Sequence, residues 1–253
     1  MKIAMIGAGA FGTALGGVLV ENGHEVFYYD PKMPDCPPLA SVVTGADFVV
    51  LAAPSSTVPY LLPHLPRKVP LIIATKGVLD FALFDRFSDV MALSGPGFAD
   101  DIKAHKKTLL TATDSRVVEL FSTDYLTFDF TTDLRGVLLC GALKNVYAVI
   151  AGRSEFEVGS AEWEDFIDRA TAEMQMILAA NGADPQTALL ACGVGDLKLT
   201  CNYPSRNYEF GRILRLDPTA RPEQTAEGVS TLAEIRAGKI VIPTEATIIN
   251  GVK

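Results

Sequence analysis

Three glycines close to the N-terminus constrain the fold of this chain more than any other feature. Gly7, Gly9 and Gly12 stand between the apolar run Lys2–Ile6 and the helix-like segment Thr13–Glu21. In a G-x-G-x-x-G pattern the first glycine permits a tight turn, the second lets the backbone approach a pyrophosphate, and the third lets helix and strand pack closely. The N–H groups that begin the helix favour an anion. The pattern therefore predicts a strand, a phosphate-binding turn and a helix, which together begin a dinucleotide-binding domain.

The acid Asp30 supports the same interpretation. It follows the predicted second strand, His24–Tyr29, and lies 18 residues beyond Gly12 (30 − 12). An acid at about this spacing bonds the 2′-hydroxyl of the adenosine ribose and repels a 2′-phosphate. We therefore expect NAD to be preferred as cofactor, with the use of NADP left open. The alternative is that Asp30 is a turn residue before Pro31.

Further apolar runs continue the α/β pattern. We expect strands at residues 48–53, 71–74 and 90–93, with further candidates at 108–113 and 125–130, and a proline-rich loop at 31–39. Pro54 follows the first of these strands, where the far ribose of a cofactor rests, and Lys76 follows the second. Open α/β sheets bind ligands beyond the carboxyl ends of their strands, so Lys76 is either a ligand contact or a solvated loop lysine. The alternation predicts a doubly wound Rossmann domain over residues 1–132.

The second half changes to helical periodicity, which predicts an all-helical domain over residues 133–253. Its most unusual segment is the apolar run Val137–Gly152, which has one charge, Lys144, at its centre. The run is too short and too interrupted for a membrane span, so no membrane insertion is expected. An ammonium in a buried helix is costly unless an anion meets it. Lys144 therefore either reaches the surface or a structural carboxylate, or it faces a cleft and handles an anionic or proton-accepting substrate.

Other helices are expected at 161–180, from 185 and from 226, and a last segment begins at Pro243. The net charge of −8 and the lack of a basic block argue against nucleic acid as a partner. The 4 cysteines show neither a CxxC pair nor zinc spacing, so we expect free thiols, no metal and a cytoplasmic location. The N-terminal apolar run superficially resembles a signal peptide, but its glycines fit a strand, turn and helix better.

Seven blocks, taken in order, resemble the NAD(P)-dependent glycerol-3-phosphate dehydrogenase family. They are GAGAFGTAL from residue 7, TKG from 75, LSGPGFA from 93, GALKNVYA from 141, GVGDLKLTC from 193, SRNYEFG from 205 and AEGVST from 226. The resemblance implies a Rossmann domain followed by a helical domain. It also implies reversible hydride transfer between a nicotinamide and C2 of sn-glycerol 3-phosphate, giving dihydroxyacetone phosphate, and thus a supply of glycerol 3-phosphate for phospholipid synthesis. A homodimer through the helical half is implied as well.

The resemblance also implies the roles of individual residues. The catalytic residues are expected to be Lys144, Lys76 and Asp196. The phosphorylated substrate is expected to contact Lys76, Gly95, Gly97, Lys144, Asn145, Asp196, Ser205, Arg206 and Asn207. The cofactor is expected to contact Gly7, Gly9, Ala10, Phe11, Gly12, Asp30, Pro54, Lys76, Ala99, Arg206 and Glu227. Two alternatives stay open, namely Asp196 as a helix cap and Arg206 as a surface ion-pair partner.

Physical chemistry agrees with these roles. Reduction of a ketone places negative charge on its oxygen, which a nearby ammonium can stabilise and protonate. A second lysine within reach would lower the pKa of the first, and a carboxylate could orient it. An arginine can hold a phosphate with two parallel hydrogen bonds.

The chain departs from the family pattern at several places. The segment after Asp30 is shorter, the chain stops soon after Pro243, and Gly97 replaces a hydroxyl residue. The glycine-rich segment after the Lys144 helix is replaced by a stretch with several acids. Two other functions therefore stay open. One is a related two-domain dehydrogenase acting on a hydroxy acid or a phosphorylated alcohol, and the other is a cofactor-binding homologue without catalysis.

Overall fold

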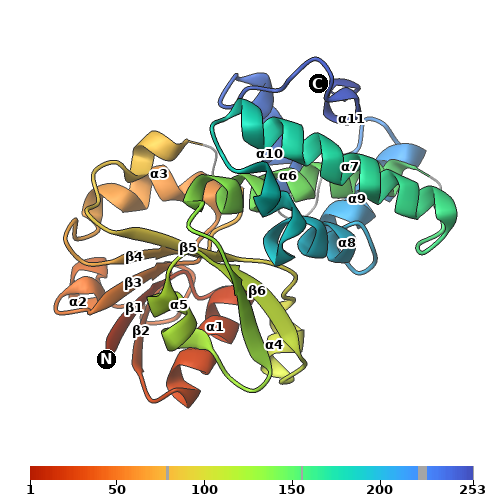
Figure 1. Ribbon diagram of the computed structural model, residues 1–253. Coiled ribbons are helices and arrows are strands. Elements are labelled where there is room, and N and C mark those ends of the chain that lie inside the picture. The colour runs from red at the N-terminus through yellow and green to blue at the C-terminus, as the bar shows by residue number, and fades with distance from the viewer. Residues whose placement is uncertain (78–79, 155, 222–226, 253) are drawn as a thin grey trace. The chain divides into compact units, whose positions relative to one another are not determined.

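The protein forms two compact units (Figure 1). A computed structural model describes residues 1–77, 80–154, 156–221 and 227–252. Unit 1 contains Met1–Thr75 and Asp80–Leu134, and unit 2 contains the described residues of Lys76–Leu79 and Arg135–Lys253. Lys76 thus belongs to unit 2, although it lies three residues (76 − 73) beyond the strand Leu71–Ile73 of unit 1.

Unit 1 is built on a seven-stranded sheet. Its strands are β1 (Lys2–Ile6), β2 (Glu25–Tyr29), β3 (Phe48–Leu51), β4 (Leu71–Ile73), β5 (Val90–Ser94), β6 (Thr108–Ala112) and β7 (Leu126–Phe130). The spatial order is β2-β1-β3-β4-β5-β6-β7. All neighbours are parallel except β5 and β6, which are antiparallel. The Rossmann fold class is confirmed, including both candidate strands at the edge, and the one antiparallel junction makes the sheet mixed.

Helices cover both faces of this sheet. They are α1 (Ala10–Glu21), α2 (Leu39–Val43), α3 (Val58–Leu61), α4 (Ala99–Lys103) and α5 (Ser115–Phe121). In Figure 1, α1, α4 and α5 lie on one face and α3 on the other. Strand side chains alternate between faces, so Ile3 and Met5 pack with Leu15 of α1, while Ala4 and Ile6 are buried on the opposite face. Burial on both faces explains why β1, β3 and β4 are nearly continuous apolar runs.

The proline-rich connection after β2 contains no helix until Leu39, so the expected loop is confirmed over residues 31–38. The short helix α2 follows this loop. The loop and α2 follow β2 in sequence, directly after Asp30.

Unit 2 is helical. Its α-helices are α6 (Leu134–Arg153), α7 (Ala161–Ala180), α8 (Asp196–Thr200), α9 (Arg206–Leu216), α10 (Glu227–Arg236) and α11 (Thr247–Asn250). The single shorter helix expected from residue 185 is wrong in detail: the segment forms a 3-10 helix at Pro185–Leu189, a π-helical turn at Ala191–Gly195, and then α8. The start expected at Ala226 lies outside the described residues, and α10 is seen from Glu227. The last segment is helical only in α11.

The apolar helix α6 forms the core of unit 2. Every residue from Gly136 to Ala148 is buried. Its length and composition would suit a membrane span, but 78% of the relevant window is buried within the described protein, as in the core helix of a globular domain. Gly152 brings α6 against α9, because a Cβ there would collide with the carbonyl oxygen of Tyr208.

Candidate active site

The glycine turn of unit 1 has the geometry of a phosphate cradle. Gly7 has φ +109° and a Cβ there would lie 2.7 Å from the backbone of Ala52, whereas a Cβ on Gly12 would collide with the carbonyl oxygen of Gly7. Apart from its two chain neighbours, no atom of the described residues lies within 4 Å of the Cβ position of Gly9. Among the described residues, no side chain caps α1. Backbone N–H groups and room for close approach at a helix N-terminus fit the pyrophosphate of a dinucleotide.

Asp30 is fixed beside this turn. Its Oδ2 accepts a hydrogen bond from the N–H of Ala8 at 3.0 Å, and its Oδ1 accepts one from the N–H of Lys32 at 3.0 Å. The hydrogen bond from Lys32 is the one expected of a turn residue, which was the alternative role of Asp30. The hydrogen bond from Ala8 fixes the carboxylate next to the glycine turn. Each carboxylate oxygen can accept a further hydrogen bond, so the turn role leaves capacity for a ribose hydroxyl.

Other expected cofactor positions lie in the same unit. Phe11 and Ala99 are half-buried and pack against the core between α1 and the sheet. Ala10 is the exposed first residue of α1, and Pro54 is exposed just after β3. Glu227, by contrast, belongs to unit 2, where it begins α10.

The loop after β5 explains why a glycine stands at position 97. The N–H of Gly97 donates to the carbonyl oxygen of Gly95 at 2.9 Å, and Gly95 has φ +148°. A Cβ on Gly97 would lie 3.3 Å from the side-chain carbons of Ile102 and Leu110. The apolar side chains around this loop therefore leave little room for the hydroxyl residue of the family pattern.

In unit 2, two lysines share one buried carboxylate. The Nζ of Lys144 donates to Oδ1 of Asp196 at 2.9 Å, and the Nζ of Lys76 donates to Oδ2 of Asp196 at 3.0 Å. The side chains of Asp196 and Lys144 are 1% and 6% exposed, whereas that of Lys76 is 22% exposed. The three residues expected to be catalytic therefore lie together, although 120 positions separate Lys76 from Asp196.

Thr200 is the fourth member of this group, and we did not expect it from the sequence. Its Oγ1 accepts a hydrogen bond from Nζ of Lys144 at 2.7 Å and donates one to Oδ1 of Asp196 at 3.2 Å. Asp196 and Thr200 lie four residues apart on α8, hence on one face of the helix. That spacing within the GDLKLTC block was the signal that could have identified it.

Burial lowers the pKa of Lys144 from its ordinary value of 10.5 to about 8. Asp196 opposes this shift because its negative charge favours the ammonium, whereas Lys76 adds to the shift by like-charge repulsion. A lysine with a pKa near 8 can both donate and accept a proton close to neutral pH. Such a perturbed group beside a charged partner is typical of catalytic sites.

A chain of amides joins α6, α9 and α10. Asn145 donates to the carbonyl oxygen of Gly141 at 3.1 Å and accepts a hydrogen bond from Nδ2 of Asn207 at 2.9 Å. Oδ1 of Asn207 accepts in turn from the N–H of Gly228 at 3.0 Å. Both asparagines were expected to contact substrate, and the structure shows that their amides also connect three helices.

The SRN block lies at the start of α9. Ser205 caps this helix, with Oγ accepting a hydrogen bond from the N–H of Tyr208 at 3.5 Å. Arg206 is the exposed first residue of α9. Arg206 takes part in none of the ion pairs found among the described residues. The surface ion pair that was the alternative role of Arg206 is therefore not seen among them.

Comparisons with known proteins agree with this geometry. A model described as the NAD-dependent glycerol-3-phosphate dehydrogenase N-terminus matches residues 2–35, and the C-terminus model of the same family matches residues 133–252. A glycerol-3-phosphate dehydrogenase [NAD(P)+] of Halorhodospira halophila is 34% identical over 287 positions, covering 93% of this chain and 86% of the relative. The chain belongs to the NAD-dependent glycerol-3-phosphate dehydrogenase family.

A second relative agrees with this assignment, and a solved structure shows the same fold. The enzyme of the same name from Leptospira biflexa is 33% identical, covering 94% of this chain and 85% of the relative. The crystal structure of glycerol-3-phosphate dehydrogenase from Coxiella burnetii has a TM-score of 0.79 at 24% identity, covering 97% of this chain and 92% of that one, and shows the shared fold. The alignment with the Halorhodospira relative is longer than the 253 residues of this chain, so that relative has residues that this chain lacks. The N-terminal model stops matching at residue 35, shortly after Asp30.

Proposed function

We propose that this family member interconverts sn-glycerol 3-phosphate and dihydroxyacetone phosphate by hydride transfer with NAD(P)(H), and so supplies glycerol 3-phosphate for phospholipid synthesis. The observation that carries this proposal is the buried carboxylate of Asp196 held between Lys144 and Lys76. Two ammoniums and one carboxylate leave a net positive charge, which suits a ketone oxygen that becomes negative during reduction.

Lys144 acts as the proton donor in the direction of reduction. A bound nicotinamide supplies the hydride, or accepts it in the reverse direction. Lys144 stabilises the developing alkoxide and protonates it, and its pKa of about 8 lets the neutral amine take the proton back during oxidation. Asp196 and Thr200 hold Nζ in place, while the more exposed Lys76 contacts substrate.

Arg206 holds the phosphate of the substrate. Its exposed guanidinium stands at the first residue of α9, where backbone N–H groups also favour an anion. Ser205, Asn207 and Asn145 provide further substrate contacts from α9 and α6, and we also assign the backbone at Gly95 and Gly97 to the substrate. We assign to Arg206 and to Lys76 contacts with the cofactor as well as with the substrate.

The cofactor is NAD in preference to NADP, because the carboxylate of Asp30 would repel a 2′-phosphate. The residues assigned to it are the glycine turn with Ala10 and Phe11, and Asp30, Pro54, Ala99 and Glu227. We further propose a homodimer formed through the helical unit, a cytoplasmic location, and domain limits of 1–132 and 133–253.

The test is to follow NADH oxidation with dihydroxyacetone phosphate as substrate, with pyruvate and a neutral ketone, dihydroxyacetone, as comparisons. We expect turnover with the phosphorylated ketone and little with the other two. Turnover with pyruvate instead would favour the hydroxy-acid dehydrogenase, and NADH binding without any turnover would favour the non-catalytic homologue.

The phosphate contact has a separate control. Arg206→Gln should raise KM for dihydroxyacetone phosphate by roughly a hundredfold, since about 3 kcal/mol is typical of a charge-assisted pair. Arg212→Gln, on the same helix and paired with Glu209, should leave KM unchanged. An equal effect of both substitutions would contradict the role given to Arg206.

A further inference from the structure

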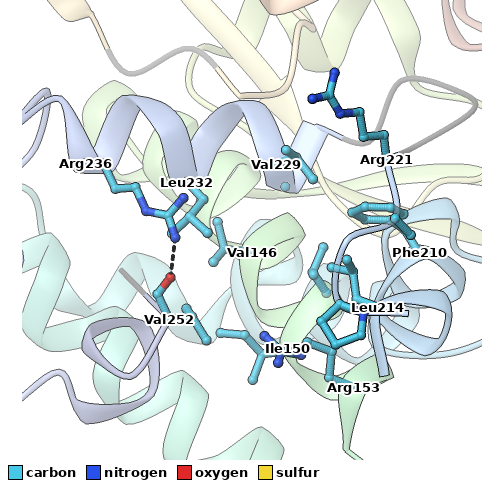
Figure 2. A pocket seen from close by; sticks show the side chains of 14 residues that line it. Val146, Ile150, Arg153, Phe210, Leu214, Arg221, Val229, Leu232, Arg236 and Val252 are labelled. Carbon is cyan, nitrogen blue, oxygen red and sulfur yellow. Dashed lines mark hydrogen bonds between the residues drawn. The ribbon is translucent and has the colours of Figure 1, made fainter. Parts of the chain in front are cut away.

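Unit 2 contains an apolar pocket that is separate from the lysine group. The pocket has a volume of about 350 Å³ and lies between α6, α9 and α10 (Figure 2). Its walls include Val146, Ile150, Phe210, Leu214, Val229 and Leu232. Lys144, Lys76 and Asp196 do not line it, so the reaction proposed above leaves this pocket without a role.

Arginines provide the charge of this pocket. Arg153, Arg221 and Arg236 line it together with apolar and glycine residues, and no carboxylate of the described residues does so. Figure 2 shows these three side chains at different sides of the apolar wall. Arg236 also donates to the carbonyl oxygen of Val252 at 2.8 Å. Among the described residues, three cations with no acid in the same lining are a local exception in a chain whose net charge is −8.

These features indicate the chemistry of a ligand. Small-molecule sites are pockets of roughly 300–1,000 Å³ with mainly apolar walls and a few polar groups that fix orientation. The walls here suit an alkyl chain, and guanidiniums at the edge suit a carboxylate or phosphate. We propose that this pocket binds the alkyl chain of a single anionic amphiphile, with its carboxylate or phosphate head paired with one of the arginines at its edge.

Such a ligand would touch elements that also hold the lysine group. Val146 lines the pocket and lies two residues beyond Lys144 on α6 (146 − 144). Gly228 lines it as well, and its N–H donates to Asn207 in the amide chain described above. The proposed site is therefore next to the active-site helices without using any of the residues assigned to the reaction.

The test is calorimetric titration of the full chain with decanoate and with decyl phosphate, below the concentrations at which they form micelles. Decanol tests the alkyl chain without charge, acetate and inorganic phosphate test the heads alone, and decyltrimethylammonium tests the opposite charge. We expect saturable binding of one decanoate or decyl phosphate per chain, with every other probe at least about tenfold weaker. Equal binding of the cationic amphiphile would overturn the proposal.

Variants connect the binding to this pocket. Substituting Arg153, Arg221 and Arg236 together by Gln should weaken decanoate binding about tenfold or more and leave decanol binding unchanged. Arg212→Gln, an exposed arginine of α9 outside the pocket, is the matched control and should change neither. Val229→Trp keeps all three charges but fills the pocket, and should abolish binding of both ligands.

Circular dichroism and Tm verify that each variant is folded. Decanoate affinity that is unchanged in the triple arginine variant, or in Val229→Trp, would overturn the proposal. Sedimentation velocity adds a further criterion. A dimeric wild type that becomes monomeric with Val229→Trp would show that a second copy of the chain covers the pocket, and this result would also overturn it.

Discussion

Lys144 donates a hydrogen bond from Nζ to Oδ1 of Asp196 across 2.9 Å, and both side chains are almost completely buried. A buried charge without a partner is strongly destabilising, so each of these residues makes the burial of the other tolerable. Lys76 occupies the second carboxylate oxygen of Asp196. Removal of Lys144 therefore leaves the carboxylate paired, whereas removal of Asp196 leaves a buried ammonium next to a second cation.

Lys144→Met should reduce kcat/KM for dihydroxyacetone phosphate by about 10²- to 10³-fold, the range typical of losing one donor to a developing oxyanion. Lys198→Met is the matched control, because Lys198 is an exposed lysine of α8 paired with Glu164. Steady-state kinetics of both variants provide the comparison. Equal activity of the two variants would contradict the role of Lys144 in protonation.

Thr200→Val should lower kcat/KM about tenfold, since Lys144 loses the hydroxyl that accepts its shortest hydrogen bond. The same loss disfavours the ammonium, so the pKa of Lys144 should fall and the midpoint of the pH–rate profile should move to lower pH. Thr200→Ser keeps the hydroxyl and should restore both. A valine variant with a lower rate but an unmoved midpoint would indicate only a packing role for Thr200.

The pH dependence follows from the pKa of Lys144, which burial lowers to about 8. Reduction needs the ammonium, so kcat for dihydroxyacetone phosphate should be constant below that pH and fall above it. Oxidation of glycerol 3-phosphate needs the neutral amine and should show the opposite trend. The pH–rate profiles measured in both directions test this. A midpoint that is unchanged in Lys144→Met would show that another group is responsible for it.

The same pKa shift has a consequence for stability. The pKa of Lys144 is lower in the folded chain than the ordinary 10.5, so between about pH 8 and 10.5 the unfolded chain binds more protons at this residue. The contribution of Lys144 to the free energy of unfolding therefore increases as pH rises through this window. Urea unfolding of wild type and Lys144→Met, compared across the window, isolates that contribution.

Asp30→Ala should raise the ratio of kcat/KM for NADPH to that for NADH by at least about tenfold, because the repulsion of a 2′-phosphate is removed. Glu25→Ala, at the other end of β2, is the control for a general change in charge. A wild type that prefers NADPH, or an unchanged ratio in Asp30→Ala, would show that Asp30 does not meet the ribose.

Much of the fold could be predicted from the sequence, because it depends on local chemistry. Sterics required glycine at positions 7 and 12 of the turn. The apolar runs of β1, β3 and β4 were recognisable because burial on both faces leaves almost no polar positions. The uniform burial of α6 likewise follows from its composition. Ordered sequence blocks then identified the family, and with it the expectation that Lys144, Lys76 and Asp196 act together.

Other features were decided only by tertiary structure. Nothing local to Lys76 indicated that it belongs to the helical unit. The spacing of Asp196 and Thr200 placed both on one face of α8, but that Lys144 meets this face depends on a contact between segments far apart in sequence. The run around Lys144 left open whether its charge was structural or functional. The fold places Asp196, from 52 residues away, against the ammonium, and this contact makes the burial of Lys144 tolerable. The burial itself lowers the pKa of Lys144 to about 8, and it exists only in the folded chain.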